Sequence, residues 1–431
     1  MTHKIYSYIT AWALAACATS LQAQTTAYIC DGYDYETVQI KSRTDIQVSA
    51  DQSQVTLGDK TFDIADVDSI VFNEPQYPAV DIVWADGTAE VNIDKRITGV
   101  QAQVVGGYVT IRSTNTTDEI LYRLSGSSTD GGLVLNGNYK LRMDLNGVSL
   151  TSKNGCPMDI ECGKRIEVKM LKDTENTFVD GAGNTQKGAF YAKGHLEFKG
   201  KGTLNVTGNA KHAICAGEYL QFKPSCGTVN ILSAVSDGIH CGKGKQNDDN
   251  SRFIMDGGTV NVSGAGSDCI DCDDYGSAFI NGGTLTLNVT QSDGTGLKAD
   301  SIVYMTGGHI RLNVSGDISQ GIRYCMDGHF TGGTIDGTIS GNGAKGIKAK
   351  KAKSGSTVMN GADAHFDGTD MSLTISGGTY TVDNTKCYGL HIDKDLYQTA
   401  GTITFDITNA EADSYKAKAT YLTGGTITPN K

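Results

Sequence analysis

A short phrase that recurs along the second half of the chain constrains its fold more than any other feature. The phrase is of the type Gly-Thr-(aliphatic)-x-(aliphatic), with variations, and its first six copies are 25, 31, 25, 25 and 25 residues apart. Three further copies follow at steps of 45, 23 and 24, so about 20 residues are inserted into one repeat. A fixed period of this size predicts stacked structural units rather than one globular core. The anchor glycines are Gly202, Gly227, Gly258, Gly283, Gly308, Gly333, Gly378, Gly401 and Gly425.

Apolar and polar residues alternate with period two after each anchor, which predicts a strand with side chains such as Leu204 and Val206 pointing inward. A second short strand is expected at residues 237–240 and at the equivalent positions of later repeats. A third is expected near residues 253–255, 278–280 and 302–304. Three strands per 23 to 25 residues, with 54 Gly, only 5 Pro and no helical pattern, predict an all-β parallel β-helix of about ten coils.

The sequence before the repeats lacks the recurring phrase and divides into separate segments. Residues 1–23 are typical of a signal peptide cut before Gln24, and a competing interpretation makes Cys17 the lipid anchor of a bacterial lipoprotein. Residues 24–79 are expected to form a small strand-rich leader, and residues 80–431 the β-helix. Its first strands, at 80–119, are irregular, and regular coils begin near residue 200. No other stretch approaches the roughly 18 apolar residues of a membrane span.

The overall charge argues against one class of partner. A net charge of -11 and a pI near 5.2 disfavour binding to a nucleic-acid backbone and are compatible with binding cations. The eleven cysteines match no zinc signature. Cys269 and Cys272 have CxxC spacing, but their position in the repeat explains that spacing better than redox or metal chemistry. Some of the cysteines could pair in an oxidising compartment, but the sequence indicates no particular disulfide.

Acidic residues fall at equivalent positions of successive repeats. Stacked strands lie about 4.8 Å apart, and carboxylates at that distance repel one another unless a cation neutralises them. Ca²⁺ takes six to eight oxygen ligands, so we expect calcium here. The alternative is a solvated acidic face, because Asp is favoured in turns. The expected metal ligands are Asp237, Asp268, Asp271, Asp273 and Asp300, with Asp248, Asp249, Asp274 and Asp293 in nearby turns.

Lys298 stands at the position of Asp271 on the next repeat. It is the candidate base for proton abstraction from a uronic acid, as in a polysaccharide lyase. Nearby carboxylates keep a lysine protonated, so this role requires a bound Ca²⁺ to cancel their effect. A salt bridge is the competing interpretation. No nucleophilic triad and no isolated pair of carboxylates for glycoside hydrolysis stands out.

The same positions become basic beyond Gly308. This basic patch fits an acidic polysaccharide, and it equally fits a solubilising edge around the inserted segment. Tyr388 and His391 bracket one second-strand phrase and are expected to project together as ligand-binding residues, with Arg323 and Lys348. Both tryptophans precede the repeats, which excludes a flat tryptophan platform within them. The basic residues are Arg323, Lys345, Lys348, Lys350, Lys351 and Lys353.

An ordered series of phrases carries a resemblance to a known family. They are Tyr-Arg-Leu-Ser-Gly at 122–126, Asp-Leu-Asn-Gly-Val-Ser-Leu at 144–150, Thr-Glu-Asn-Thr-Phe-Val-Asp-Gly at 174–181, Ser-Asp-Gly-Ile at 236–239, and the repeated Gly-Gly-Thr. Over roughly residues 100–431 the chain resembles exported bacterial carbohydrate-binding proteins built on a right-handed parallel β-helix, a scaffold similar to that of pectate lyases.

The resemblance implies binding to plant-type polysaccharides, including acidic pectin-like chains, with bound calcium at Asp237, Asp268 and Asp271. Later repeats depart from the family's Asp-Gly-Ile, with Thr295, Gln320 or Lys345 in place of the aspartate, so calcium is not expected there. The main hypothesis is a secreted or surface-bound, noncatalytic, calcium-bearing polysaccharide-binding protein. The alternatives are a calcium-dependent lyase that uses Lys298 as base and a structural or adhesive surface protein. The sequence does not indicate an oligomeric state.

Overall fold

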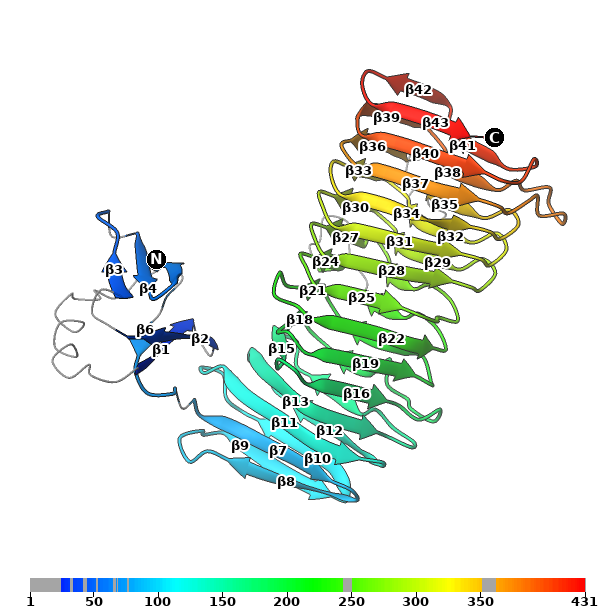
Figure 1. Ribbon diagram of the computed structural model, residues 1–431. Helices are drawn as coiled ribbons and strands as arrows, with labels where there is room; N and C mark the ends of the chain where they lie inside the picture. Colours follow the sequence, from blue (N-terminus) through cyan, green and yellow to red (C-terminus); the bar gives the residue numbers. More distant parts are fainter. Residues whose placement is uncertain are drawn as a thin grey trace. The chain divides into compact units, whose positions relative to one another are not determined.

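The computed structural model describes residues 25–31, 34–41, 45–51, 53–64, 67, 69–75, 77–242, 250–350 and 362–430. The expected signal peptide, Cys17, Asp248, Asp249, Lys351 and Lys353 lie outside these residues. The chain divides into two compact units, Met1–Pro78 and Ala79–Lys431 (Figure 1). No α-helix occurs among the described residues, and none of them forms a segment that meets the requirements of a membrane-spanning helix.

The first unit contains two small antiparallel sheets around its own apolar core. One sheet has the strand order β2-β1-β6 and the other β3-β4-β5. Alternate residues of these strands, such as Ala27, Ile40 and Leu57, are buried together. The strands are β1 (Thr25–Asp31), β2 (Asp34–Ile40), β3 (Ile46–Val48), β4 (Gln54–Leu57), β5 (Lys60–Asp63) and β6 (Ser69–Val71).

The second unit begins with two antiparallel hairpins. β7 (Ala79–Ala85) pairs with β8 (Thr88–Ile93), and β9 (Val100–Val105) pairs with β10 (Gly107–Ser113). The hairpins turn at Gly87 and Gly106, which have φ values of 80° and 60° that favour glycine. Beyond them all strand pairing in the described residues of this unit is parallel, and each strand pairs with its equivalent in the next repeat.

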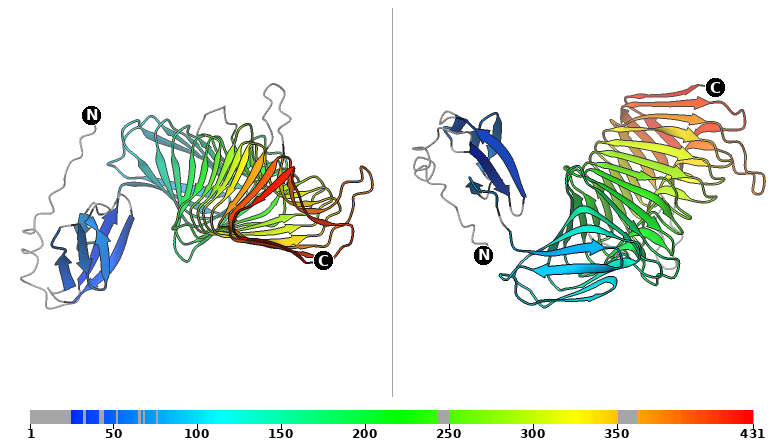
Figure 2. Two further views of the ribbon diagram at one scale, coloured as in Figure 1. Left: turned by 90° about the horizontal axis from the view of Figure 1, so that it is seen from above. Right: turned by 60° about the horizontal axis from the view of Figure 1, so that its bottom comes forward.

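Three series of strands run along this unit, and Figure 2 shows the repeats following one another in sequence order from cyan to red. The first series forms a 13-stranded sheet, called here the site sheet. After β9 and β10 it contains β12 (Gly131–Asn136), β14 (Met158–Glu161), β17 (Gly188–Ala192), β20 (His212–Ala216), β23 (Ile239–Cys241), β26 (Ile270–Cys272), β29 (Thr295–Ala299), β32 (Gln320–Tyr324), β35 (Lys345–Ala349), β38 (Tyr388–Ile392) and β41 (Asp413–Lys416).

The other two series belong to a 24-stranded sheet that starts with β7, β8, β11 (Ile120–Ser128) and β13 (Leu141–Thr151). One series contains β15 (Ile166–Met170), β18 (Leu196–Lys199), β21 (Leu220–Phe222), β24 (Arg252–Met255), β27 (Ser277–Ile280), β30 (Ile302–Met305), β33 (Asp327–Phe330), β36 (Asp363–Asp367), β39 (Asp395–Ala400) and β42 (Ala419–Leu422). The other contains β16 (Glu175–Val179), β19 (Thr203–Gly208), β22 (Thr228–Ala234), β25 (Thr259–Val262), β28 (Thr284–Val289), β31 (His309–Val314), β34 (Thr334–Ile339), β37 (Asp370–Ile375), β40 (Thr402–Ile407) and β43 (Thr426–Asn430).

The all-β class and the parallel stacking of repeats are therefore confirmed. The second strands predicted from residues 237–240 onward are β23 and its successors, and the predicted third strands are β24, β27 and β30. One anchor is wrong. Gly378 lies between β37 and β38, and Thr369 holds the anchor position, because Thr334 pairs with Asp370 and Met371 with Ile403. The additional residues of this repeat thus fall in two places, between β35 and β36 and between β37 and β38.

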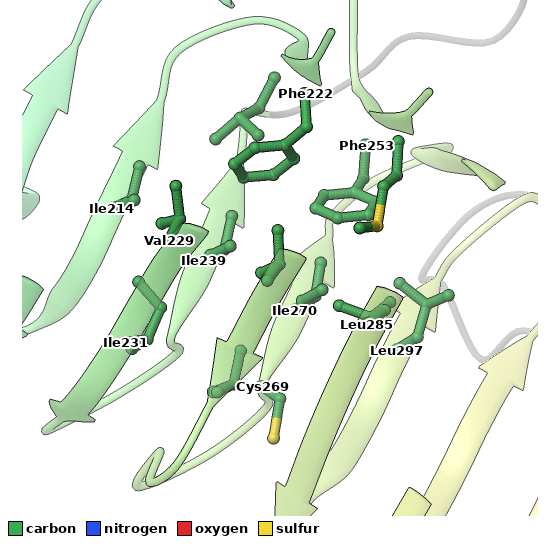
Figure 3. Close-up of a cluster of buried hydrophobic side chains, with 14 of the residues drawn as sticks. Ile214, Phe222, Val229, Ile231, Ile239, Phe253, Cys269, Ile270, Leu285 and Leu297 are labelled. Atoms are coloured by element: carbon green, nitrogen blue, oxygen red, sulfur yellow. The ribbon is translucent and has the colours of Figure 1, made fainter. Parts of the chain in front are cut away.

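Stacked apolar side chains fill the space between the sheets. Leu204, Val206 and their equivalents are fully buried, as the alternation predicts. Phe222 stacks on Phe198 with ring centroids 5.4 Å apart. Phe253 packs against Phe222 at 5.7 Å with the two ring planes tilted by 57° (Figure 3). The ten described cysteines are all free. Burial of the stacked apolar side chains removes apolar surface from water in every repeat. Each repeat therefore adds a similar contribution to the stability of the array.

Candidate functional site

The outer face of the site sheet carries a continuous line of polar side chains. His240 lies between Ile239 and Cys241, which point into the core, so its side chain is on the opposite face. Register extends this position from strand to strand, at about 4.8 Å per step. We call the line the polar column; it consists of His240, Asp271, Lys298, Arg323, Lys348, His391 and Lys416.

A second line lies three residues earlier, at or just before the start of the same strands, and its members from Asp237 to Lys345 are buried. It contains two of the predicted metal ligands, Asp237 and Asp268, which are 5% and 7% exposed. Each holds the backbone of the next repeat. The Asp268 N–H donates to Asp237 Oδ1 at 3.3 Å, and the Thr295 N–H donates to Asp268 Oδ1 at 2.8 Å. These aspartates therefore have a structural role besides any ligand that they bind.

Lys298 places its ammonium group among these carboxylates. Its Nζ lies 2.9 Å from Asp271 Oδ1 and 3.4 Å from Asp268 Oδ2. Burial acts to lower the pKa of Lys298, but the carboxylates of Asp271 and Asp268 prevail and raise it above its usual value. We call Asp237, Asp268, Asp271 and Lys298 the acidic segment. The structure brings these four predicted residues together, with a protonated lysine as their internal counter-ion.

The carboxylates of the acidic segment differ in their proton affinity. Burial raises the pKa of Asp271 to about 6, in opposition to Lys298, and burial also raises the pKa of Asp268. Asp237 is buried as well, but hydrogen bonds with His212 and His240 more than offset that effect and lower its pKa. Asp237 is therefore charged at neutral pH, and Asp271 gains a proton most readily on acidification.

The other two predicted metal ligands, Asp273 and Asp300, form a separate group with Asp274. One carboxylate oxygen from each of the three residues lies within 4.8 Å of the others. Asp274 and Tyr275 both have positive φ, at 38° and 64°, so the chain turns sharply at this point. Burial raises the pKa of Asp300 in spite of Lys298 and Arg323 nearby. All three ligands are oxygens, the donor set that hard cations prefer.

The later strands carry the opposite charge. We call Arg323, Lys345, Lys348, His391 and Lys416 the basic segment. Burial, Lys350 and Arg323 lower the pKa of Lys348, and burial followed by Lys348 lowers that of Lys345 to about 8.

The two predicted ligand-binding residues Tyr388 and His391 lie together, with ring centroids 5.3 Å apart. Burial, Lys348 and Lys416 lower the pKa of His391 to about 4. Among the described residues, His391 Nδ1 and Arg323 Nε are buried without a hydrogen-bond partner. The basic segment therefore combines a cluster of positive charge with buried nitrogen atoms that have no hydrogen-bond partner.

Sequence reasoning missed two histidines. His212 Nδ1 and His240 Nδ1 each lie 3.1 Å from Asp237 Oδ2. His212 lies 25 residues before Asp237, the length of one repeat, but Ala213 stands where later repeats have glycine and conceals the match. Lys416 was missed for a similar reason, because the last repeat lacks the phrase.

Comparisons with known proteins identify one related family. The model of a family described as "Carbohydrate-binding domain-containing protein" matches residues 105–411, which is more than half of the chain. No curated protein matches the chain. Among solved structures, the chain is similar to a polysaccharide lyase-like protein from C. thermocellum, determined as a gadolinium derivative. The identity is 14% and the TM-score 0.34, over 81% of this chain and 100% of the other.

Proposed function

Since the chain belongs to the family of carbohydrate-binding domain-containing proteins, we propose that it is a noncatalytic, calcium-bearing protein that binds acidic, pectin-like or other plant-type polysaccharides. We also propose that its repeats form a right-handed parallel β-helix. Each strand pairs with its equivalent one repeat later, which supports this architecture. Export to the outside of a bacterial cell, either secreted or anchored through Cys17, belongs to the same proposal and rests on the sequence of the first 24 residues.

The basic segment is the single observation that carries this proposal. Its cations lie one strand apart, so they follow the direction in which the repeats stack. Their mutual repulsion and burial lower the pKa of Lys348, and a carboxylate of the ligand would relieve both effects. A chain of uronic acids presents one carboxylate per sugar. It could therefore lie along the polar column and pair successively with Arg323, Lys348 and Lys416.

Calcium is best accommodated by Asp273, Asp274 and Asp300. These residues offer carboxylate oxygens from two neighbouring repeats, and Ca²⁺ accepts such oxygens in flexible geometry. The group of Asp237, Asp268 and Asp271 fits calcium less well, because Lys298 already supplies a positive charge there. A calcium ion at Asp300 would hold two repeats together beside Arg323.

Two alternatives remain distinct from this proposal. A lyase needs Lys298 as an unprotonated base, and the carboxylates that raise its pKa oppose that role at neutral pH. A structural or adhesive surface protein would bind no soluble glycan. The polar column favours neither alternative over binding.

Electrophoresis through gels that contain polygalacturonate tests the proposal. We expect the wild-type chain to be retarded with calcium present, and the double variant R323A/K348A to bind at least about tenfold more weakly, because two charge-assisted contacts are lost. The control K172A/K201A removes the same charge from exposed positions outside the site sheet and should bind like wild type. Equal weakening of both double variants would reduce the effect to net charge and overturn the proposal.

The same samples separate binding from catalysis. Noncatalytic binding predicts no rise in the ultraviolet absorbance of unsaturated uronides, with or without calcium. A rise that K298A abolishes would establish the lyase instead. If the chain neither is retarded by nor forms product from any acidic or neutral plant polysaccharide, the structural or adhesive function becomes the best explanation.

A further inference from the structure

Two imidazoles and two carboxylates converge beside the acidic segment. His212 lies on β20, His240 on β23 and Asp271 on β26, and Asp237 precedes β23. The Nδ1 atoms of both histidines lie 3.1 Å from Asp237 Oδ2, and Nδ1 of His240 is 3.7 Å from Asp271 Oδ2. The two rings stack with their centroids 4.4 Å apart and their planes 17° apart. Three consecutive strands of the site sheet thus direct nitrogen and oxygen atoms to one point.

In the absence of a metal, hydrogen bonds join these groups. Nδ1 of His240 and Oδ2 of Asp237 are hydrogen-bonded at 3.1 Å, and Nδ1 of His212 lies at the same distance from Oδ2. A divalent cation that takes the place of the shared protons would bind the same nitrogen and oxygen lone pairs. His212 and Asp237 are nearly fully buried, so these ligand atoms are held away from bulk water.

The distances and the donor types fit a transition metal. Two ligands on a tetrahedral Zn²⁺, with bonds of about 2.0 to 2.1 Å, lie about 3.3 Å apart. The two His–Asp separations of 3.1 Å are close to this value. Imidazole nitrogen suits zinc, copper, iron and nickel, whereas calcium prefers oxygen throughout. We propose that His212, Asp237 and His240, with Asp271 as the fourth ligand, form a site for a divalent transition metal of the Zn²⁺ type.

The second oxygen of each carboxylate has a partner that orients it. Asp237 Oδ1 accepts the backbone N–H of Asp268 at 3.3 Å, and Asp271 Oδ1 pairs with Lys298 Nζ at 2.9 Å. Outer partners of this kind fix the ligands of protein metal sites. On this proposal the site sheet and the turns beside it would offer two cation sites of different chemistry, one with nitrogen and oxygen ligands and one, at Asp273, Asp274 and Asp300, with oxygen ligands alone. This inference does not depend on glycan binding.

Co²⁺, which gives a visible absorbance that reports nitrogen and oxygen ligands, serves as the probe. The metal-free chain, prepared by dialysis against chelator, is titrated with Co²⁺ and then with Zn²⁺ in competition. We expect one Co²⁺ per chain, displaced by Zn²⁺ but not by equimolar Ca²⁺. H240Q and D237N should each bind at least about tenfold more weakly, since even outer partners of a metal contribute this much.

H365Q is the matched control. His365 stacks on His329 with ring centroids 4.9 Å apart, and the two rings contact different oxygens of Asp327, at 3.4 Å from His365 and 3.3 Å from His329. The pair resembles the proposed site, but its nitrogen atoms do not meet at one oxygen as those of His212 and His240 do at Asp237 Oδ2. This variant should bind Co²⁺ like wild type. Equal Co²⁺ affinity in H240Q, D237N and H365Q would overturn the proposal, as would a wild-type chain that takes up no stoichiometric Co²⁺. The wild-type titration decides the matter even if a variant fails to fold.

Discussion

The acidic and basic segments occupy the same backbone positions of the same sheet, yet their electrostatics are opposite. In the acidic segment, Lys298 lies within 3.4 Å of two carboxylates, and Asp237 contacts two histidines. In the basic segment, burial and neighbouring cations lower the pKa values of Lys345, Lys348 and His391. The first segment supplies its own counter-ion in Lys298, whereas in the second the nearby carboxylates, such as Asp393 beside Lys348, do not offset burial and the repulsion between cations.

The difference shows that repeat position decides where a side chain lies, while its neighbours on adjacent strands decide what it does. Asp271, Lys298 and Arg323 are successive members of the polar column. Lys298 lies beside Asp271 and Asp268, which raise its pKa, whereas burial and the neighbouring cations lower the pKa of Lys348. The boundary between the two segments therefore lies between β29 and β32.

The largest effect should come from removing the counter-ion of the acidic segment. K298M leaves two buried carboxylates without their cation, and breaking a buried ion pair of this kind costs about 3 to 5 kcal/mol. K348M makes the same exchange in the basic segment, where it relieves repulsion, and should change stability little. Urea unfolding at pH 7 with chelator present measures both variants. Similar losses would mean that the two segments do not differ electrostatically.

The sequence predicted the positions of the strands well because each repeat obeys the same alternation. Leu204, Val206 and their equivalents are buried as expected, and Asp237, Asp268 and Asp271 meet as expected. The anchor at Gly378 was wrong because Gly-Thr is favourable in a turn as well as before a strand. The pairings of Thr334 with Asp370 and of Met371 with Ile403 identify the true register.

The site was less predictable, since contacts between repeats depend on which way a side chain turns. The sequence indicated that Lys298 follows Asp271 in the column, and left its choice between base and salt bridge open. Its contacts with Asp268 and Asp271 are those of a salt bridge. His212 could not be assigned, because the phrase that would align it with Asp237 is interrupted at Ala213. No period in the sequence reports that both rings turn toward Asp237.

The two segments should also respond to pH in opposite directions, which sharpens the comparison. Burial raises the pKa of Asp271 to about 6, so the folded state favours its protonated form. Its contribution is full below about pH 4 and is lost as the pH rises through 6. The pKa of His391 falls to about 4, so its contribution is full above about pH 6.5 and is lost as the pH falls toward 4.

Unfolding free energies of D271N and H391Q between pH 4 and 7 measure these contributions. Between pH 4 and 7, titration of Asp271 should lower the unfolding free energy of the wild-type chain by about 2 kcal/mol, and D271N should not show this decrease. Titration of His391 should raise the unfolding free energy by a similar amount, and H391Q should not show this increase. The slope in each variant is the readout, because either substitution also shifts the absolute stability. Slopes that change in the same direction would contradict the opposite environments of the two residues.

The smallest effect should be a gain of stability in the basic segment. Lys345 is only 2% exposed, and burial with Lys348 lowers its pKa to about 8. The folded state therefore favours the neutral amine, so the charged side chain destabilises the protein at neutral pH. K345M removes this cost but also removes the hydrogen bond that Lys345 donates to the Gly343 carbonyl oxygen. The net effect should be a gain in unfolding free energy of about 1 kcal/mol at pH 7.

Raising the pH provides the decisive control for K345M. The wild-type chain regains the lost stability as Lys345 deprotonates between about pH 8 and 10.5, so the advantage of K345M should disappear by pH 10. K418M, at an exposed lysine outside the site sheet, should differ from wild type by a constant amount over this range. If K345M remained more stable than wild type at pH 10, the gain would come from better apolar packing rather than from relief of an uncompensated charge. The electrostatic contrast between the two segments would then not extend to the buried line beside the polar column.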